Sequence, residues 1–236
     1  MKRLSVFILF ICLITFSIIF WIDLAFFFQV ILISTLIKLI VEFFLLRIKN
    51  YSFCSPYIDF TQLLYTCLII YFTYYSTSDN GEIISNLLIG DTLTYYNESL
   101  YFAAIAENNF LNYLSYTSIN YFFYQFILSL LYLTFSANYY FSGLMLSAFI
   151  GILNLLLIIK ISELAKLKLP TLRNVMIFYI IFPHIIAAST ALLKDNIIVF
   201  SFLILIYSCL KVILIKPKLK YYFHIFMALI LCSLLR

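Results

Sequence analysis

Asp91, Tyr95 and Glu98 are polar side chains whose types and spacing could do chemistry together. They lie in the stretch GDTLTYYNES, which begins at Gly90, and a helix over residues 91–106 would bring all three near one another. Facing a cavity, Asp91 could act as a general base, or could hold a divalent cation with Glu98 as a partner. The alternative is that Asp91 is an N-cap, satisfying amide donors in the first turn of that helix.

A second chemical candidate is the pair Lys194 and Asp195, which stands between two apolar runs. Lys194 could bind a phosphate group while Asp195 orients it. Alternatively, Lys194 extends its ammonium to a membrane interface and Asp195 caps the helix that follows. Arg236 ends the last apolar run, and it is either a further phosphate anchor or an end-of-helix charge.

The composition indicates which elements must position these side chains. The chain has 236 residues, of which 65% are hydrophobic and 11% charged, and its mean hydropathy is +1.09. Soluble domains carry roughly 25% charged residues, so this chain cannot cover a water-facing surface. Long continuous apolar runs predict an all-α polytopic transmembrane helical bundle and exclude the alternating pattern of a membrane β-barrel.

The charge and the cysteines exclude other classes. The net charge of +5 comes from short basic clusters between apolar runs, which is a membrane-topology signal, so nucleic acid is not an expected partner. The five cysteines show no CxxC spacing and most lie inside apolar runs, which argues against a disulfide framework or a zinc site.

The apolar runs and the positive-inside rule together predict the topology. The runs cover residues 4–22, 24–46, 58–75, 121–135, 139–160, 174–190, 196–215 and 221–235. If all of them crossed the membrane, the basic clusters at 166–173 and 216–220 would lie outside. The run 121–135 is short and rich in Tyr and Phe, so we expect it to be an outer juxtamembrane helix. Seven spans then remain, with the N-terminus inside and the C-terminus outside.

This topology divides the chain into three parts: three N-terminal transmembrane helices at 1–75, an outer loop with interfacial helices at 76–138, and four C-terminal transmembrane helices at 139–236. The outer loop 76–120 contains acidic residues but no Lys or Arg. Within the second span, Lys38 and Glu42 are four residues apart and are expected to neutralise each other. Pro183 is expected to kink the sixth apolar run.

Three features in order carry a family resemblance. They are GDTLTYYNESLYFAA in the outer loop, the span SGLMLSAFIGILNLLLIIKISELAK, and the junction PHIIAASTALLKDNIIVFSFL. This arrangement resembles the GT-C-type membrane glycosyltransferases and the polysaccharide polymerase-like proteins related to them. The resemblance covers roughly residues 76–236. Such enzymes are usually longer, so it implies a short or truncated member.

The resemblance implies a function and a set of roles. Asp91 would act at the acceptor or at a metal, and Lys194 and Asp195 would lie at the lipid-phosphate end of the site. The expected partners are membrane lipid, a polyprenyl-phosphate-linked sugar and a glycan acceptor, and a divalent cation is a possible cofactor. Tyr95 could stack on a sugar ring or belong to an interfacial aromatic belt. The location would be the outer face of a bacterial inner membrane, in envelope polysaccharide assembly.

Two other functions remain open from the sequence. One is a transporter of lipid-linked glycans or small solutes, which should place charged groups near the middle of the membrane. Lys38 and Glu42 are the candidates for such a role. The other is an inactive membrane fragment, in which Asp91 is only a helix cap and Lys194 only an interfacial anchor.

Overall fold

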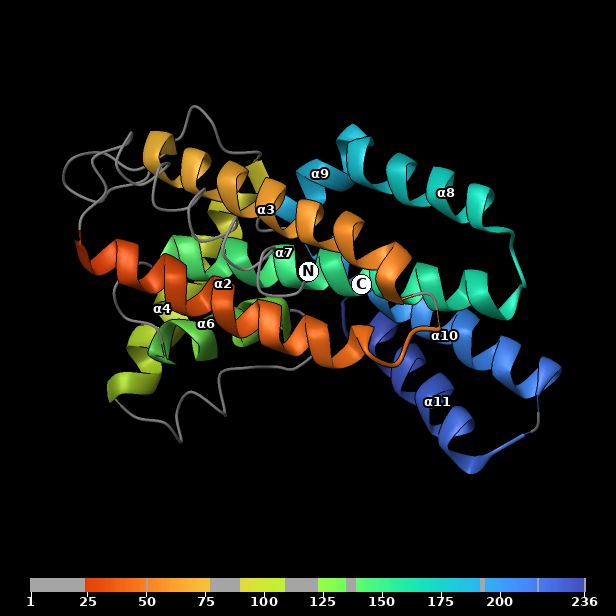
Figure 1. Ribbon diagram of the computed structural model, residues 1–236. Helices are drawn as coiled ribbons and strands as arrows, with labels where there is room; N and C mark the ends of the chain where they lie inside the picture. Colours follow the sequence, from red (N-terminus) through yellow and green to blue (C-terminus); the bar gives the residue numbers. More distant parts are fainter. Residues whose placement is uncertain are drawn as a thin grey trace.

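The computed structural model describes residues 24–49, 51–76, 90–108, 123–134, 139–191, 194–215 and 217–235, and this part of the chain is helical without any strand (Figure 1). The helices are α2 (Leu24–Leu45), α3 (Tyr51–Ser76), α4 (Gly90–Asn108), α6 (Phe123–Thr134), α7 (Tyr139–Leu164), α8 (Leu169–Ile181), α9 (Pro183–Thr190), α10 (Asp195–Leu214) and α11 (Leu219–Leu234). The predicted all-α class is therefore confirmed.

Four of these helices are long and apolar enough to cross a membrane, namely α2, α3, α7 and α10. The pair α8 and α9 makes a fifth span if the two bent segments are counted as one. Several long apolar helices identify an integral membrane protein. Of the remaining predicted spans, 4–22 lies outside the described residues, and 221–235 corresponds to α11, which has only 16 residues.

The central element of the bundle is α7, which packs against α2, α3, α6, α8, α9 and α10 (Figure 1). Large apolar side chains are buried along its whole length, including Phe141, Leu144, Ile152 and Ile159. In contrast, α10 and α11 expose many large apolar side chains, for example Ile213 and Phe226. An apolar surface of this kind is what a lipid-facing helix presents.

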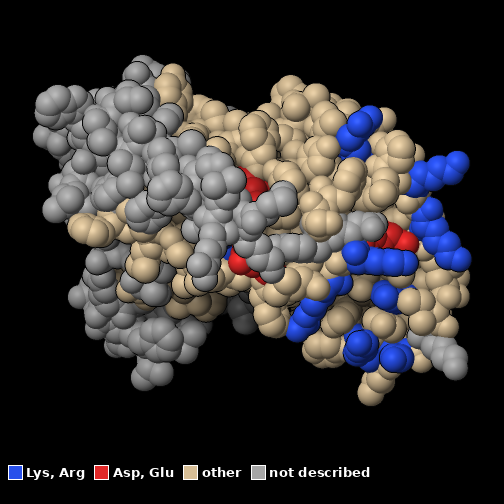
Figure 2. Space-filling model, viewed as in Figure 1, with Lys and Arg blue, Asp and Glu red and all other residues tan. Residues whose placement is uncertain are grey.

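The three basic connections lie at the same end of the bundle. Figure 1 shows the α2–α3, α7–α8 and α10–α11 connections together at one end, and Figure 2 shows Lys and Arg gathered there. This arrangement satisfies the positive-inside rule only if α6 does not cross between α3 and α7. With 12 residues, α6 is about 18 Å long, which is shorter than the roughly 30 Å hydrocarbon layer. We call this end of the bundle the basic end.

At the basic end of the bundle, α7 closes with a left-handed residue. Lys166 has a φ of 55°, its amide donates to the carbonyl of Glu163, and the amide of Leu167 donates to that of Ser162. This pair of bonds is the Schellman motif, in which glycine is the usual left-handed residue. The motif satisfies the last carbonyls of α7 and turns the chain into α8.

Lys38 makes a buried ionic contact that the sequence pattern only partly predicts. Its ammonium contacts the Asp59 carboxylate of α3 and lies 3.8 Å from the Glu42 carboxylate of its own helix. Ser55 donates a hydrogen bond to the other Asp59 oxygen at 3.3 Å. The expected Lys38–Glu42 pair is therefore a trio of two carboxylates and one ammonium, because α3 brings Asp59 beside it.

Candidate functional site

The bend between α8 and α9 helps to form a hollow in the described bundle. The two helices meet at 58°, and Phe182 between them is extended with φ −71° and ψ 118°. Pro183 has no amide hydrogen and disfavours the helical conformation in the residue before it. The predicted kink at Pro183 is therefore confirmed, and it turns α9 away from the direction of α8.

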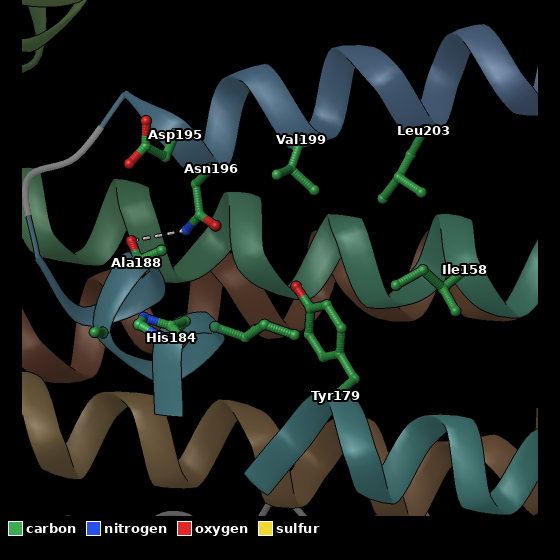
Figure 3. A pocket seen from close by; sticks show the side chains of 10 residues that line it. Ile158, Tyr179, His184, Ala188, Asp195, Asn196, Val199 and Leu203 are labelled. Carbon is green, nitrogen blue, oxygen red and sulfur yellow. Dashed lines mark hydrogen bonds between the residues drawn. The ribbon is translucent and has the colours of Figure 1, made fainter. Parts of the chain in front are cut away.

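A pocket of about 510 Å³ lies between this bent pair, α7 and α10 (Figure 3). Its polar side chains are Asp195, Asn196, His184 and Tyr179, and the rest of its lining is Ile158, Ile185, Ala187, Ala188, Val199 and Leu203. Figure 3 shows Asp195, Asn196 and His184 toward one end and Val199, Leu203 and Ile158 toward the other. The pocket thus has a polar end and an apolar end.

Asn196 anchors the start of α10 to two neighbouring helices. Its side-chain amide donates to the carbonyls of Ser147 and Ala188, both at 3.0 Å, and to the hydroxyl of Ser189 at 3.3 Å. The backbone carbonyl of Asn196 accepts a hydrogen bond from the Asn154 side chain at 3.2 Å. These bonds satisfy buried polar groups, and they fix the polar end of the pocket.

Gly151 allows α9 to approach α7 closely. A Cβ atom at this position would lie 2.9 Å from the Ser189 Cβ and 3.2 Å from the Tyr65 ring. The backbone oxygen of Gly151 also accepts a 2.7 Å hydrogen bond from Tyr179 of α8. Small residues permit this type of close contact between membrane helices.

Tyr124 of α6 connects the predicted loop residue Tyr95 to the pocket. The Tyr95 and Tyr124 rings meet edge to face, with centroids 5.1 Å apart, and the Tyr124 hydroxyl lies 3.5 Å from that of Ser147. Burial raises the pKa of Tyr124, and the charges of Tyr95 and Asp195 raise it further, while the bond to Ser147 opposes them. The structure therefore places Tyr95 and Asp195 on the same side of the bundle, both within electrostatic reach of one phenol.

The N-cap position of α10 lies one residue earlier than the capping alternative placed it, at Lys194 instead of Asp195. The N-cap of α10 is Lys194, whose carbonyl accepts the amides of Ile197 and Ile198. Asp195 is the first helical residue, and the Lys194 side chain makes no capping hydrogen bond. The alternative in which Asp195 is the N-cap is therefore wrong. Its exposed carboxylate instead stands at the polar end of the pocket, where the helix dipole favours a negative charge.

The structure describes only part of what was predicted for the loop 76–138 and for the C-terminal Arg236. The predicted helix at 91–106 is confirmed as α4, and Asp91 falls in its first turn rather than before it. The Asp91 side chain and Arg236 lie outside the described residues, so their predicted roles stay predictions. Glu98 accepts a 2.8 Å hydrogen bond from Gln125, and this bond ties α4 to α6.

The structure adds residues that the sequence reading did not use. Asn196 lines the polar end of the pocket, Ser147 accepts its hydrogen bond, Gly151 admits α9, and Asp59 completes the trio around Lys38. The available signal was a polar residue inside an apolar run for Asn196, Ser147 and Asp59, and a small residue inside a span for Gly151. As for a metal, no group of three His, Cys, Asp or Glu side chains among the described residues is arranged to hold one.

Comparisons with known proteins provide no family for this chain. No protein family matches the sequence, and neither the curated proteins nor the solved structures contain a significant match.

Proposed function

We propose that this protein is a membrane enzyme that transfers a sugar from a polyprenyl-phosphate-linked donor at the outer face, as the resemblance to GT-C-type glycosyltransferases implies. The observation that carries the proposal is the pocket between α7, α8, α9 and α10, with its polar and apolar ends. A lipid-linked sugar has the same division between a charged head and a hydrocarbon tail.

The pocket has the size and lining of a small-molecule site, large enough for the head of such a donor and the start of its tail. Small-molecule pockets usually measure about 300–1,000 Å³ and are mostly apolar with a few polar groups, and this pocket of about 510 Å³ fits that description. His184, Asp195 and Val199 are exposed, so the pocket is open to its surroundings. A lipid tail could therefore enter sideways from the bilayer and lie against Ile158 and Leu203.

The polar end offers the groups that sugar transfer needs. In the proposed reaction, an acceptor hydroxyl attacks the anomeric carbon while Asp195 takes its proton. The bond between that carbon and the phosphate oxygen breaks, and polyprenyl phosphate leaves with the electron pair. Lys194, the residue before Asp195, would stabilise the charge that develops on this phosphate. Asp91 remains a second candidate for the base.

A photoreactive polyprenyl phosphate tests whether the pocket binds the donor. We expect it to label the wild-type protein and to label Val199→Trp at least roughly tenfold less, because the indole would fill the pocket. Ile206→Trp is the matched control, since Ile206 is on the same helix and is 43% exposed against 45% for Val199. Equal labelling of both variants would contradict the pocket.

The same preparation tests the chemistry. Asp195→Asn should keep the photolabelling but lose the transfer of labelled sugar by a factor of about 100 or more, which is typical for removal of a general base. Glu163→Gln removes a carboxylate from the basic end and should retain transfer. If Asp195→Asn transfers sugar at the wild-type rate, Asp195 is not the base.

A transporter is the second candidate, and one observation favours it. Lys38, Glu42 and Asp59 place charges inside the predicted spans α2 and α3, and α8 and α9 form a broken helix pair, as transporters often have. Asp59→Asn separates the two candidates. A transporter using the trio should lose uptake by vesicles when Asp59 is replaced, whereas the proposed transferase should retain sugar transfer in Asp59→Asn if this variant reaches wild-type membrane levels.

A further inference from the structure

The basic end carries a large excess of positive charge. Its described cations are Arg47, Lys49, Lys160, Lys166, Lys168, Arg173, Lys211, Lys218 and Lys220. Among the described carboxylates, Glu163 alone belongs to this end, because Glu42 and Asp59 contact Lys38 deeper in the bundle. Such an excess is unfavourable unless an anion offsets it.

Three of these cations come together from separate elements. Arg47 follows α2, Lys160 belongs to the last two turns of α7, and Lys211 belongs to the last turn of α10. Lys160 is half-buried on α7, which packs against both α2 and α10, and its charge interacts with those of Arg47, Lys211 and Glu163. Like charges from the α2–α3 connection, α7 and α10 therefore lie near one another at the basic end.

Two of these cations lie against aromatic rings and form no ion pair with a carboxylate among the described residues. The Arg47 guanidinium lies 4.4 Å from the centre of the Phe43 ring, and the Lys211 ammonium lies 5.5 Å from that of Tyr207. The ion pairs within 4 Å in the described residues all involve Lys38. The three cations can therefore direct their hydrogen-bond donors toward a ligand.

The depth of Lys160 indicates the type of anion. Lys160 lies four residues before the end of α7, which places its Cα about 6 Å from the helix end. The exposed Leu214 and Ile215, next to Lys211, offer an apolar surface for acyl chains. Basic groups between transmembrane helices at the cytoplasmic side bind lipid headgroups, and the apolar surface beside Lys211 fits acyl chains better than a soluble anion.

We infer that Arg47, Lys160 and Lys211 bind the phosphate of an anionic phospholipid in the inner leaflet. Arg and Lys are the residues that bind phosphate oxygens, the first as a planar fork and the second as a point charge. This site lies at the opposite end of α10 from the pocket, and it does not depend on the proposed sugar transfer.

Native mass spectrometry of the whole protein in neutral detergent tests the inference, with phosphatidylglycerol and phosphatidylcholine as probes. We expect one phosphatidylglycerol to bind in preference to phosphatidylcholine. Lys160→Gln should weaken it about fivefold, the effect of one cation near an anionic headgroup. Lys218→Gln removes an equal charge from the exposed α10–α11 connection and should change binding less than about twofold.

Each of the other outcomes overturns the inference. Equal losses in Lys160→Gln and Lys218→Gln would show general attraction to the basic end instead of a site. Complete displacement of the lipid by inorganic phosphate would indicate a soluble phosphate ligand. Arg47→Gln, which alters an exposed side chain outside the helices, repeats the test if Lys160→Gln does not fold.

Discussion

At the scale of single residues, the pocket depends on a few small or polar side chains placed within apolar helices. Gly151 admits α9, Asn196 ties α10 to α7 and α9, and Pro183 sets the bend. Hydrogen bonds between membrane helices are individually modest, and those measured average about 0.6 kcal/mol. The close approach at Gly151 is therefore the residue-level feature most sensitive to change.

Gly151→Ala tests this close approach. We expect a loss of about 1 to 3 kcal/mol in stability, because the new methyl group would overlap Ser189 and force the helices apart. The measurement is unfolding of the purified protein in detergent. Gly151→Ala combined with Ser189→Gly should recover part of the loss, since it removes the overlapping atoms. A single variant as stable as the wild type would show that α9 does not pack as described.

At the scale of elements, α2 and α3 are joined by the trio of Lys38, Glu42 and Asp59. Breaking a buried ion pair by removing one partner is costly, because it leaves a charge without compensation. Replacing the whole group by neutral side chains is often tolerated. The trio can thus be tested as a connection between two helices, separately from any role in transport.

Lys38→Met should lower stability by about 3 to 5 kcal/mol, since two carboxylates would then face each other without a cation. Lys38→Met with Glu42→Gln and Asp59→Asn should return the protein most of the way to wild-type stability and membrane level. Detergent unfolding and quantitative blotting of membranes measure the two quantities. Equal defects in the single and triple variants would argue against electrostatic coupling in the trio.

At the scale of the whole molecule, the bundle has a basic end and an opposite end formed partly by α4 and α6 (Figure 1). The positive-inside rule assigns the basic end to the cytoplasm. The pocket and the proposed lipid-phosphate site then belong to different sides of the membrane. Orientation therefore bears on both proposals.

Cysteine labelling in intact cells tests the orientation, in a variant without the native cysteines. Asn97→Cys, on the exposed face of α4, should react with a membrane-impermeant maleimide added from outside. Lys168→Cys, in the exposed α7–α8 connection, should react only after the membrane is permeabilised. External labelling at Lys168→Cys would reverse the topology and place the basic end outside.

The sequence by itself determined the class of the protein, most of its helices and the kink at Pro183. Apolar runs and Lys and Arg clusters suffice for this, because the hydrocarbon layer fixes span length and excludes open backbone. The run 121–135 was predicted not to span from the charge clusters around it and from its short, aromatic sequence, and the length of α6 agrees. Span length, charge clusters and the kink at Pro183 each depend on a single segment and its membrane or water surroundings, so they can be predicted without knowing how the segments pack.

Tertiary structure decided which polar side chains meet. Asp59 lies 21 residues from Lys38, and Asn196 lies 49 residues from Ser147. Nothing in the spacing of either pair predicts contact, since helix rotation and packing against α7 set which faces meet. The same packing placed Asp195 at a pocket rather than at a helix cap. Sequence alone therefore named the charged candidates, and only packing between helices gave them neighbours.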